Sequence, residues 1–315
     1  MDSRYRFGAA DWLLLAVVTF WAFNYVVTKT VFDSGEIVPL AFLGLRFPIM
    51  TLLMLALWLG TDRRWTWRRQ DWLPMVLVGA IGFPASSVLW TTGLAYTLIS
   101  RSAILISTAP LFTALLAPRF GGNPLSQRGW TGVLLGVAGA GTLVSAGAHV
   151  ANGHVPTLTG DLLSLGSAFV GGLCAAASRN LVRRYPVLRF TTFNILIGTV
   201  LISPLVLPPA AKVNWGQISG LTWACLVYSC LFAGIFSFWA WFYGIRRIGP
   251  ARTMVYQSLV PVLSLVLAAM FMHDRPSPLQ MVGGALAIVG VWLARSDPGR
   301  APRALPAAAA ALDEA

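Results

Sequence analysis

The chain has 315 residues, of which 57% are hydrophobic and only 11% are charged. A soluble domain of this length carries about 25% charged residues, because its surface must be solvated. The composition therefore excludes an ordinary soluble protein and indicates a chain that faces lipid. The net charge of +12 comes from basic residues in short clusters between long apolar runs. That pattern is typical of membrane proteins and argues against nucleic acid as a partner.

Runs of apolar residues long enough to cross the hydrocarbon core as helices, about 20 residues each, recur along the chain. The polar breaks between them are short, as in a bundle of antiparallel helices. Residues 1–10 are too polar for a signal peptide, and the Ala- and Pro-rich residues 296–315 predict a disordered tail. We predict an all-α membrane protein with ten transmembrane helices, at residues 11–32, 38–59, 72–96, 102–119, 128–147, 158–180, 188–208, 218–243, 250–271 and 277–294.

Basic residues set the predicted orientation. Most of the 23 lysines and arginines fall before the first run, in every second connection, or after the last run. Cytoplasmic connections carry an excess of basic residues, so this asymmetry places residues 1–10 and the tail in the cytoplasm. We expect a multi-pass protein of the cell inner membrane with both termini cytoplasmic.

The two halves of the chain resemble each other. Pro110 matches Pro261 and Gly132 matches Gly283, each pair 151 positions apart, and both stretches predict a Pro-containing helix followed by a Gly-rich helix. A repeat of five helices must insert its second copy upside down. Inverted repeats are the architecture of many secondary transporters, with the substrate site near the bilayer midplane between the halves.

The repeat gives the predicted domain organisation. The first half covers residues 11–147, an outer linker follows at 148–157, and the second half covers residues 158–295. The fifth helix of each half is rich in glycine, and small residues permit close helix approach. We expect these helices to pack within each half or to form a dimer contact, so the protein is predicted to be a monomer or a weak dimer.

Several short motifs resemble the drug/metabolite transporter superfamily, specifically its EamA type. The resemblance covers roughly residues 10–295 and implies a ten-helix carrier with a central cavity between the halves. It also implies export of amino acids or related metabolites, with the aromatic amino-acid exporters as the branch that it resembles. The motifs are Trp21, Asn24 and Lys29, the pair Arg46-Phe47, the stretch Tyr96 to Pro110, the pair Gly160-Asp161, and Gly249-Pro250-Ala251 leading to Pro261.

Acidic residues and histidines are missing from the middle of the predicted helices. All eleven acids fall at helix ends, in connections or in the tails, and the three histidines fall in outer connections. Proton-driven carriers commonly use a buried ionisable group as the relay. We therefore predict alternating access without an intramembrane carboxylate relay. The chain also shows no nucleophile–base set, metal-ligand cluster or phosphate loop, so we expect no enzyme activity, metal or cofactor.

Polar and aromatic residues at helical spacing are the candidates for lining the cavity. Each can instead serve helix packing, and that alternative stays open for all of them. Three prolines are predicted to bend helices so that one half can move against the other. The predicted hinges are Pro84, Pro110 and Pro261, and the predicted substrate-binding residues are Trp21, Asn24 and Tyr25, Ser86 and Trp90, Ser107, Tyr228, Trp239 and Tyr243, and Tyr256 and Gln257.

The sequence leaves three functions open. The first is a secondary transporter that exports amino acids, broadly or with a preference for aromatic ones, or related small metabolites. The second is a carrier for other metabolites, drugs or nucleotide sugars. The third is a membrane receptor or lipid-handling protein that transports nothing. In the first two cases the partners are a small-molecule substrate and the lipid bilayer.

Overall fold

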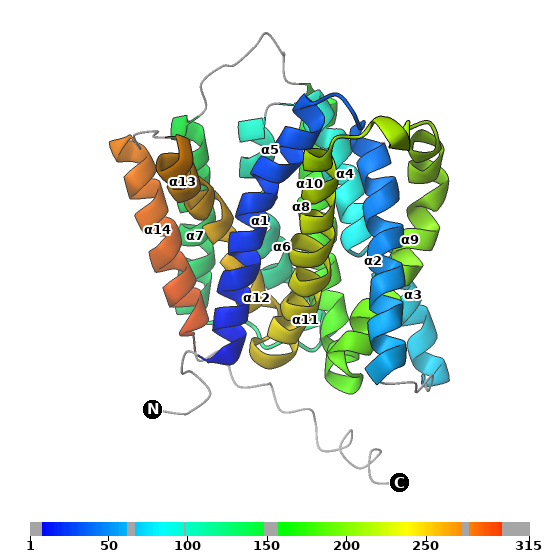
Figure 1. Ribbon diagram of the computed structural model, residues 1–315. Coiled ribbons are helices and arrows are strands. Elements are labelled where there is room, and N and C mark those ends of the chain that lie inside the picture. Colours follow the sequence, from blue (N-terminus) through cyan, green and yellow to red (C-terminus); the bar gives the residue numbers. More distant parts are fainter. Residues whose placement is uncertain (1–7, 62–66, 98, 148–156, 273–276, 298–315) are drawn as a thin grey trace.

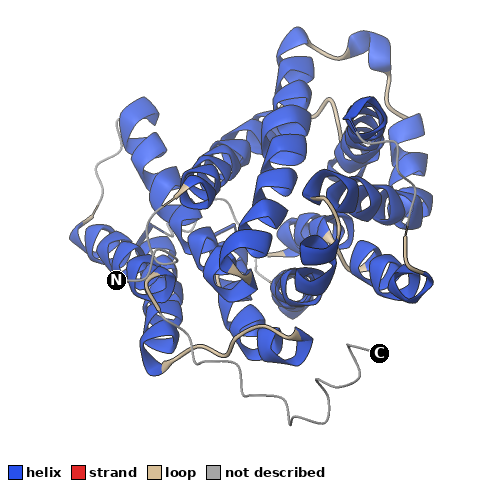
Figure 2. Ribbon diagram, turned by 90° about the horizontal axis from the view of Figure 1, so that it is seen from below, coloured by secondary structure: helices blue, strands red, loops and turns tan. Residues whose placement is uncertain are grey.

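A computed structural model describes residues 8–61, 67–97, 99–147, 157–272 and 277–297, and this part of the chain is helical with short connections (Figure 1; Figure 2). The prediction of an all-α protein is therefore confirmed for these ranges. The predicted linker and disordered tail fall almost wholly outside the described residues. Cys174, Cys225 and Cys230 are free and buried.

The first half begins with α1, whose Gly8 N–H donates a hydrogen bond of 2.8 Å to the Asp11 carboxylate in the first turn. This caps a helix end that would otherwise expose unpaired N–H groups. Both the third and the fourth predicted runs are broken into two helices. The helices of this half are α1 (Ala9–Asp33), α2 (Pro39–Thr61), α3 (Trp72–Ala80), α4 (Phe83–Tyr96), α5 (Ile99–Ile106), α6 (Ala109–Leu116) and α7 (Gln127–Gly147).

The second half repeats this order of unbroken and broken helices. Thr157 caps α8, and Ser277 caps α14 together with Gln280 in a reciprocal pair of hydrogen bonds. The helices are α8 (Leu158–Arg184), α9 (Val187–Ala211), α10 (Gly220–Cys230), α11 (Ser237–Ile248), α12 (Pro250–Val255), α13 (Leu259–Met272) and α14 (Pro278–Arg295).

Seven stretches of the described chain are long and apolar enough to cross a membrane, and Ile104–Phe120 is a shorter apolar one. Every one of the ten predicted runs overlaps helix, but the count of ten spans is not confirmed. The predicted run at 128–147 corresponds to the glycine-rich α7, and the run at 250–271 is interrupted between α12 and α13. The seven stretches are Ala9–Phe32, Pro39–Thr61, Arg69–Gly93, Leu158–Arg184, Val187–Ala211, Gly220–Ile248 and Pro278–Arg295.

Helices of one half pack on the matching helices of the other. α7 lies against α14 at one edge of the bundle, and α2 lies against α9 at the opposite edge (Figure 1). Between these edges α1 packs on α10 and α11, and its counterpart α8 packs on α4. This pairing is the arrangement that two inverted repeats produce, so the two-repeat architecture fits the structure.

Glycines bring α7 and α14 into backbone contact. A Cβ atom added at Gly132 would lie 2.7 Å from the Gly290 carbonyl oxygen, and one added at Gly283 would lie 2.8 Å from the Gly139 carbonyl oxygen. The two contacts are related by the 151-residue repeat. The glycine-rich helices contact helices of their own halves, α5 and α13, as expected, but their most extensive contact is with each other across the halves. Glycine permits this contact because it lets two backbones meet where any side chain would separate them. We call this contact the glycine seam.

A buried ion pair ties both ends of the chain together. Asp11 at the start of α1 pairs with Arg295 at the end of α14, and the Arg295 Nη2 donates to Asp11 Oδ2 over 2.9 Å. The Tyr256 hydroxyl donates to Asp11 Oδ1 over 2.6 Å. The Asp11 side chain is 1% exposed and that of Arg295 10%. The predicted position of Asp11 at a helix end is right, but its burial in this network was not expected.

A second ion pair joins the halves at the same end of the bundle. Asp71, at the start of α3, pairs with Arg184 at the end of α8 and accepts a hydrogen bond from the Tyr185 hydroxyl. Burial and the Asp71 carboxylate raise the pKa of Tyr185 above its ordinary value. Tyr185 therefore stays protonated at neutral pH and continues to donate this hydrogen bond.

The glycine seam predicts a sharp difference between two glycine substitutions. Gly139→Ala places a methyl group 2.6 Å from the Gly283 carbonyl oxygen, so the helices must separate. We expect the free energy of unfolding in mixed micelles to fall by about 1–3 kcal/mol. Gly166→Ala in α8 is the control, because its Cβ meets nothing within 4 Å, and it should be neutral or stabilising by up to about 1 kcal/mol. Equal losses for both variants would contradict the seam.

The Asp11 network predicts the effect of removing its charge. Asp11→Asn removes the carboxylate that pairs with the buried Arg295 guanidinium, so we expect a loss of about 3–5 kcal/mol in the free energy of unfolding. Tyr256→Phe removes one hydrogen bond to a charged acceptor and should cost about 1.5–3 kcal/mol. The control is Glu36→Gln, a carboxylate that accepts hydrogen bonds from Ser219 at the surface. If Asp11→Asn were no more destabilising than this control, the pair would not be structural.

Candidate functional site

Interruptions of four helices mark the candidate site. In the first half, α3 ends at Ala80 and α4 begins at Phe83. In the second half, a π-helical turn, Leu231–Phe236, separates α10 from α11. Gly82 and Ala233 are 151 positions apart, so the two interruptions fall at equivalent places in the repeat. π-helical turns and broken membrane helices occur mostly where a protein binds a ligand or moves.

The second pair of interruptions also falls at equivalent places in the repeat. α5 ends at Ile106 and α6 begins at Ala109, and a 3₁₀ turn, Tyr256–Ser258, separates α12 from α13. Buried Ser107 and buried Ser258 occupy equivalent positions, again 151 residues apart. Because α6 contacts α12, these two interruptions lie in neighbouring helices of opposite halves.

Side chains of the opposite half satisfy the backbone at the first pair of interruptions. The Trp21 Nε1 of α1 donates to the Ala233 carbonyl oxygen over 3.0 Å. The Asn194 Nδ2 of α9 donates to the Val78 carbonyl oxygen, one turn before the break after α3, over 3.1 Å. The Trp21 ring also contacts Phe83 and Trp241. Trp21 is therefore placed at an interruption between the halves, and its role in lining a cavity stays a prediction.

Asn194 is a residue that the sequence analysis missed. It is completely buried, and a Cβ added at Gly82 would lie 2.8 Å from its Oδ1 atom. A polar amide within the apolar run 188–208 was the available signal, because such a group needs a partner inside the bundle.

Three buried amide oxygens at these helices lack a hydrogen-bond donor within the described residues: the Oδ1 atoms of Asn24 and Asn194 and the Oε1 atom of Gln257. Asn24 uses its Nδ2 to donate to Thr28 over 3.3 Å along α1. A buried acceptor without a partner costs about 1–3 kcal/mol. Such oxygens can accept N–H or O–H groups of a polar ligand or of water.

The predicted residues Ser86, Ser107 and Trp90 lie in or directly between interrupted helices of the first half. Ser86, in the first turn of α4, shares a hydrogen bond of 3.0 Å with Ser167 of α8 across the two halves. Ser107 is buried between α5 and α6, and Trp90 is half-buried in α4. Tyr25 belongs to α1, but its side chain lies outside the described residues.

Tyr256 does not face a cavity in this structure. Its side chain is 2% exposed, and its hydroxyl is bound to Asp11. Neighbouring Gln257 has its unpaired Oε1 atom within the bundle. Tyr256 therefore makes a structural contact, whereas Gln257 stays a candidate for binding a polar group.

The predicted aromatic residues Tyr228, Trp239 and Tyr243 lie on α10 and α11, on either side of the π-helical turn. Tyr228 stacks on Phe232 and donates from its hydroxyl to the Phe20 carbonyl oxygen over 3.1 Å. Phe232 is 44% exposed. Trp239 and Tyr243 stack on each other, and the Tyr243 ring and hydroxyl contact Arg247. Tyr228 therefore packs on α1 next to Trp21, whereas Trp239 and Tyr243 stack on each other after the turn.

All three predicted hinge prolines lie next to interruptions. Pro84 and Pro110 occupy the first turns of α4 and α6, where a missing N–H breaks no helical hydrogen bond. Pro261 is the third residue of α13, directly after the 3₁₀ turn. The structure thus places a proline beside three of the four interruptions.

Arg46 of α2 is a buried cation within an apolar cluster. It is 7% exposed, its Nε has no hydrogen-bond partner within the described residues, and its guanidinium lies 5.9 Å from the centre of the Phe47 ring. The Cys230 thiol, at the end of α10, donates to the Arg46 carbonyl oxygen. Arg46 is therefore enclosed by the protein in this structure.

Comparison with known proteins identifies relatives over nearly the whole chain. A "Probable terminal-alkyne amino-acid exporter" of Streptantibioticus cattleyicolor is 30% identical, covering 91% of this chain and 94% of that protein. An "Uncharacterized transporter" of Archaeoglobus fulgidus is 25% identical, covering 89% of this chain and 95% of its own length. Neither is described as an exporter of aromatic amino acids, and that branch stays a prediction.

A solved structure supports the fold. A protein titled "Crystal structure of protein" superposes with a TM-score of 0.74 at 20% identity, covering 91% of this chain and 96% of that chain. The model of the EamA-like transporter family matches twice, at residues 8–145 and 158–296. The chain therefore belongs to the EamA-like transporter family.

Proposed function

We propose that this protein is a secondary transporter that exports amino acids or related small metabolites by alternating access. In this proposal, ten membrane helices form two inverted halves, residues 11–147 and 158–295, with both termini in the cytoplasm. The observation that carries it is the set of four helix interruptions at repeat-equivalent positions. At two of them, a side chain of the other half donates a hydrogen bond to a backbone carbonyl oxygen. Interrupted helices at the interface of inverted repeats are where secondary transporters bind substrates.

The unpaired amide oxygens favour a substrate with hydrogen-bond donors. An ammonium group can donate to the Asn24 Oδ1 and the Gln257 Oε1 atoms, which lack donors within the described residues. Buried Arg46 offers a guanidinium to a carboxylate. An amino acid carries both groups, and the amino-acid exporter among the relatives supports this substrate class.

Coupling to a buried carboxylate is not part of the proposal. Asp11 contacts an interrupted helix through Tyr256, and it is held in an ion pair with Arg295. A carboxylate fixed as a counter-ion stays ionised and is a poor proton carrier. The substrate's own gradient then drives export.

Flux measurements test the substrate class. Purified protein in liposomes should exchange a labelled amino acid from a broad panel against the same unlabelled compound. Asn24→Ala and Gln257→Ala should each lower the rate about tenfold, because each removes a hydrogen bond to a charged donor. Gln127→Ala, an exposed amide at the start of α7, is the matched control and should leave the rate unchanged.

Two outcomes of this assay would reject the proposal. Competition by nucleotide sugars or drugs, and not by amino acids, would identify a different carrier. Absence of flux for every compound in folded protein would favour a receptor or a lipid-handling protein.

A second measurement tests the coupling. We expect exchange to proceed at equal internal and external pH, without an imposed proton gradient, because Asp11 is fixed by Arg295. The control is the same preparation with a proton gradient, which should change the rate less than twofold. A strict requirement for the gradient would show that a carboxylate relay operates.

A third measurement tests alternating access. Asn24→Cys and Gln257→Cys should each react with a membrane-impermeant thiol reagent from both sides of the bilayer, in proportions that substrate changes. The native cysteines Cys174, Cys225 and Cys230 are buried, so the unmodified chain is the control. Labelling from one side only, whatever the substrate, would contradict the mechanism.

A further inference from the structure

A basic hollow lies at the end of the bundle where α1 begins and α14 ends. It has a volume of about 320 Å³ and lies between the end of α8, the end of α11, the start of α12 and the connection after α6. Of its 14 lining residues, five are arginines and none is an aspartate or glutamate. The arginines are Arg179 and Arg183 of α8, Arg246 and Arg247 of α11, and Arg252 of α12.

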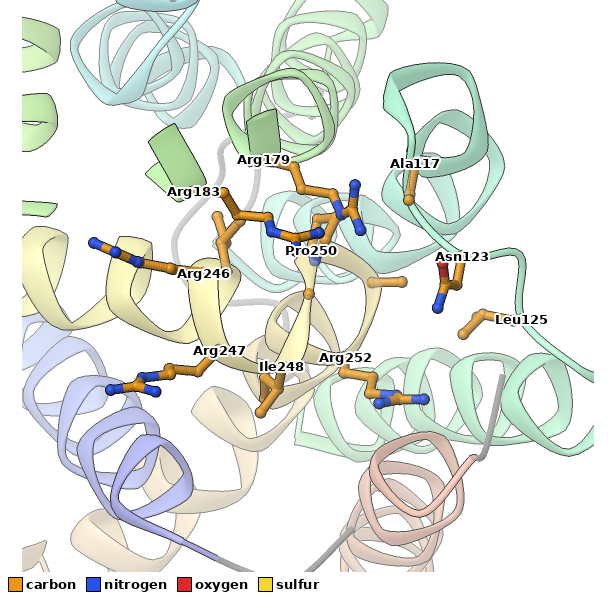
Figure 3. A pocket seen from close by; sticks show the side chains of 14 residues that line it. Ala117, Asn123, Leu125, Arg179, Arg183, Arg246, Arg247, Ile248, Pro250 and Arg252 are labelled. Atoms are coloured by element: carbon orange, nitrogen blue, oxygen red, sulfur yellow. The ribbon is translucent and has the colours of Figure 1, made fainter. Parts of the chain in front are cut away.

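The five arginines are not equivalent. Arg246 donates to the Tyr185 carbonyl oxygen, Arg247 contacts Tyr243, and Arg252 donates to the backbone of Asp297. In Figure 3 the side chains of Arg179 and Arg183 extend from α8 toward Pro250 at the centre of the view, whereas Arg246 and Arg247 extend away from it. Arg179 and Arg183 are the two whose guanidinium groups remain available to a ligand.

The positive charges of Arg179 and Arg183 repel each other, which is unfavourable for the folded protein. The two residues are one helical turn apart on α8, close enough for this repulsion. Neither forms an ion pair with a carboxylate of the described residues. Like charges at this spacing destabilise a helix, and the cost grows where the walls exclude water. The positive-inside rule accounts for arginines on this side of a membrane, but it does not account for a concave arrangement without acids.

We propose that this hollow binds a phosphate-bearing anion, held by Arg179 and Arg183 and surrounded by the other arginines. A guanidinium matches a phosphate with two parallel hydrogen bonds, and two guanidiniums balance the charge of a phosphate monoester. The Asn123 side chain on the wall adds a polar amide. A zwitterionic amino acid fits poorly, because no lining carboxylate receives its ammonium group. The hollow is thus distinct from the substrate site proposed above.

The phosphate group has two sources with the same chemistry. Basic pockets at the ends of membrane helices bind headgroups of anionic lipids, and the hollow lies at the level of the helix ends. A soluble phosphate compound reaches the same guanidinium groups from water. Two arms of one experiment separate these sources.

The first arm uses the purified full chain in nanodiscs of neutral phosphatidylcholine and titrates inorganic pyrophosphate by calorimetry. The second arm uses nanodiscs with a minor fraction of phosphatidylglycerol and counts the phosphatidylglycerol molecules retained on the protein by native mass spectrometry. Arg179→Gln with Arg183→Gln should weaken binding at least about tenfold in the arm that gives a signal. Arg183→Gln alone, at the helix surface, is the fallback if the double variant does not fold.

The matched control is Arg68→Gln with Arg69→Gln. These arginines are exposed at the same end of the bundle, do not line the hollow, and change the net charge by the same amount. Pyrophosphate binding lost only in the Arg179 and Arg183 variants identifies a soluble ligand. Lipid retention lost only in those variants identifies a headgroup. Absence of binding in both arms, or equal loss with both pairs of substitutions, overturns the proposal.

Discussion

Hydrocarbon offers no hydrogen bonds, so every interruption of a membrane helix needs a polar partner from within the protein. At two of the four interruptions in this protein, such a partner comes from the other half of the chain. Trp21 of the first half binds the carbonyl oxygen of Ala233 in the second, and Asn194 of the second half binds the carbonyl oxygen of Val78 in the first. Neither half can move freely against the other while these bonds persist. A conformational change must exchange them for other partners, and a polar substrate or water can supply those.

Two further contacts between the halves differ in kind. At one edge the glycine seam holds α7 and α14 by close backbone packing, which has no strong dependence on charge or solvent. At the end where α1 begins, Asp11 and Asp71 form ion pairs with Arg295 and Arg184. Packing at the edge provides a fixed line of contact, whereas ion pairs at the end of the bundle can separate when water enters. This division suits a molecule whose halves rock about one edge.

Sequence patterns located the helices and interruptions better than they located partners. Pro84, Pro110 and Pro261 were found because proline disturbs a helix wherever it stands, and the structure places all three beside interruptions. The seam glycines were found because small residues recur at helical spacing, but their close partner in the other half was not predicted. Helical periodicity reveals which residues share a face and is silent about the helix that the face meets. The hydrogen bond from Tyr256 to Asp11 could not be predicted for the same reason, since a phenol in an apolar run does not indicate which distant carboxylate it contacts.

The glycine seam has a consequence for how such a chain can be built. Gly132 meets Gly290 in the same way that Gly283 meets Gly139, so both halves contribute the same surface. An interface of this kind is self-complementary, like that of a two-fold symmetric dimer. Two identical polypeptides of half this length, inserted in opposite directions, could form the same contact without any covalent connection. The link between the halves then serves to fix their ratio and opposite orientation, and the affinity resides in the surfaces themselves.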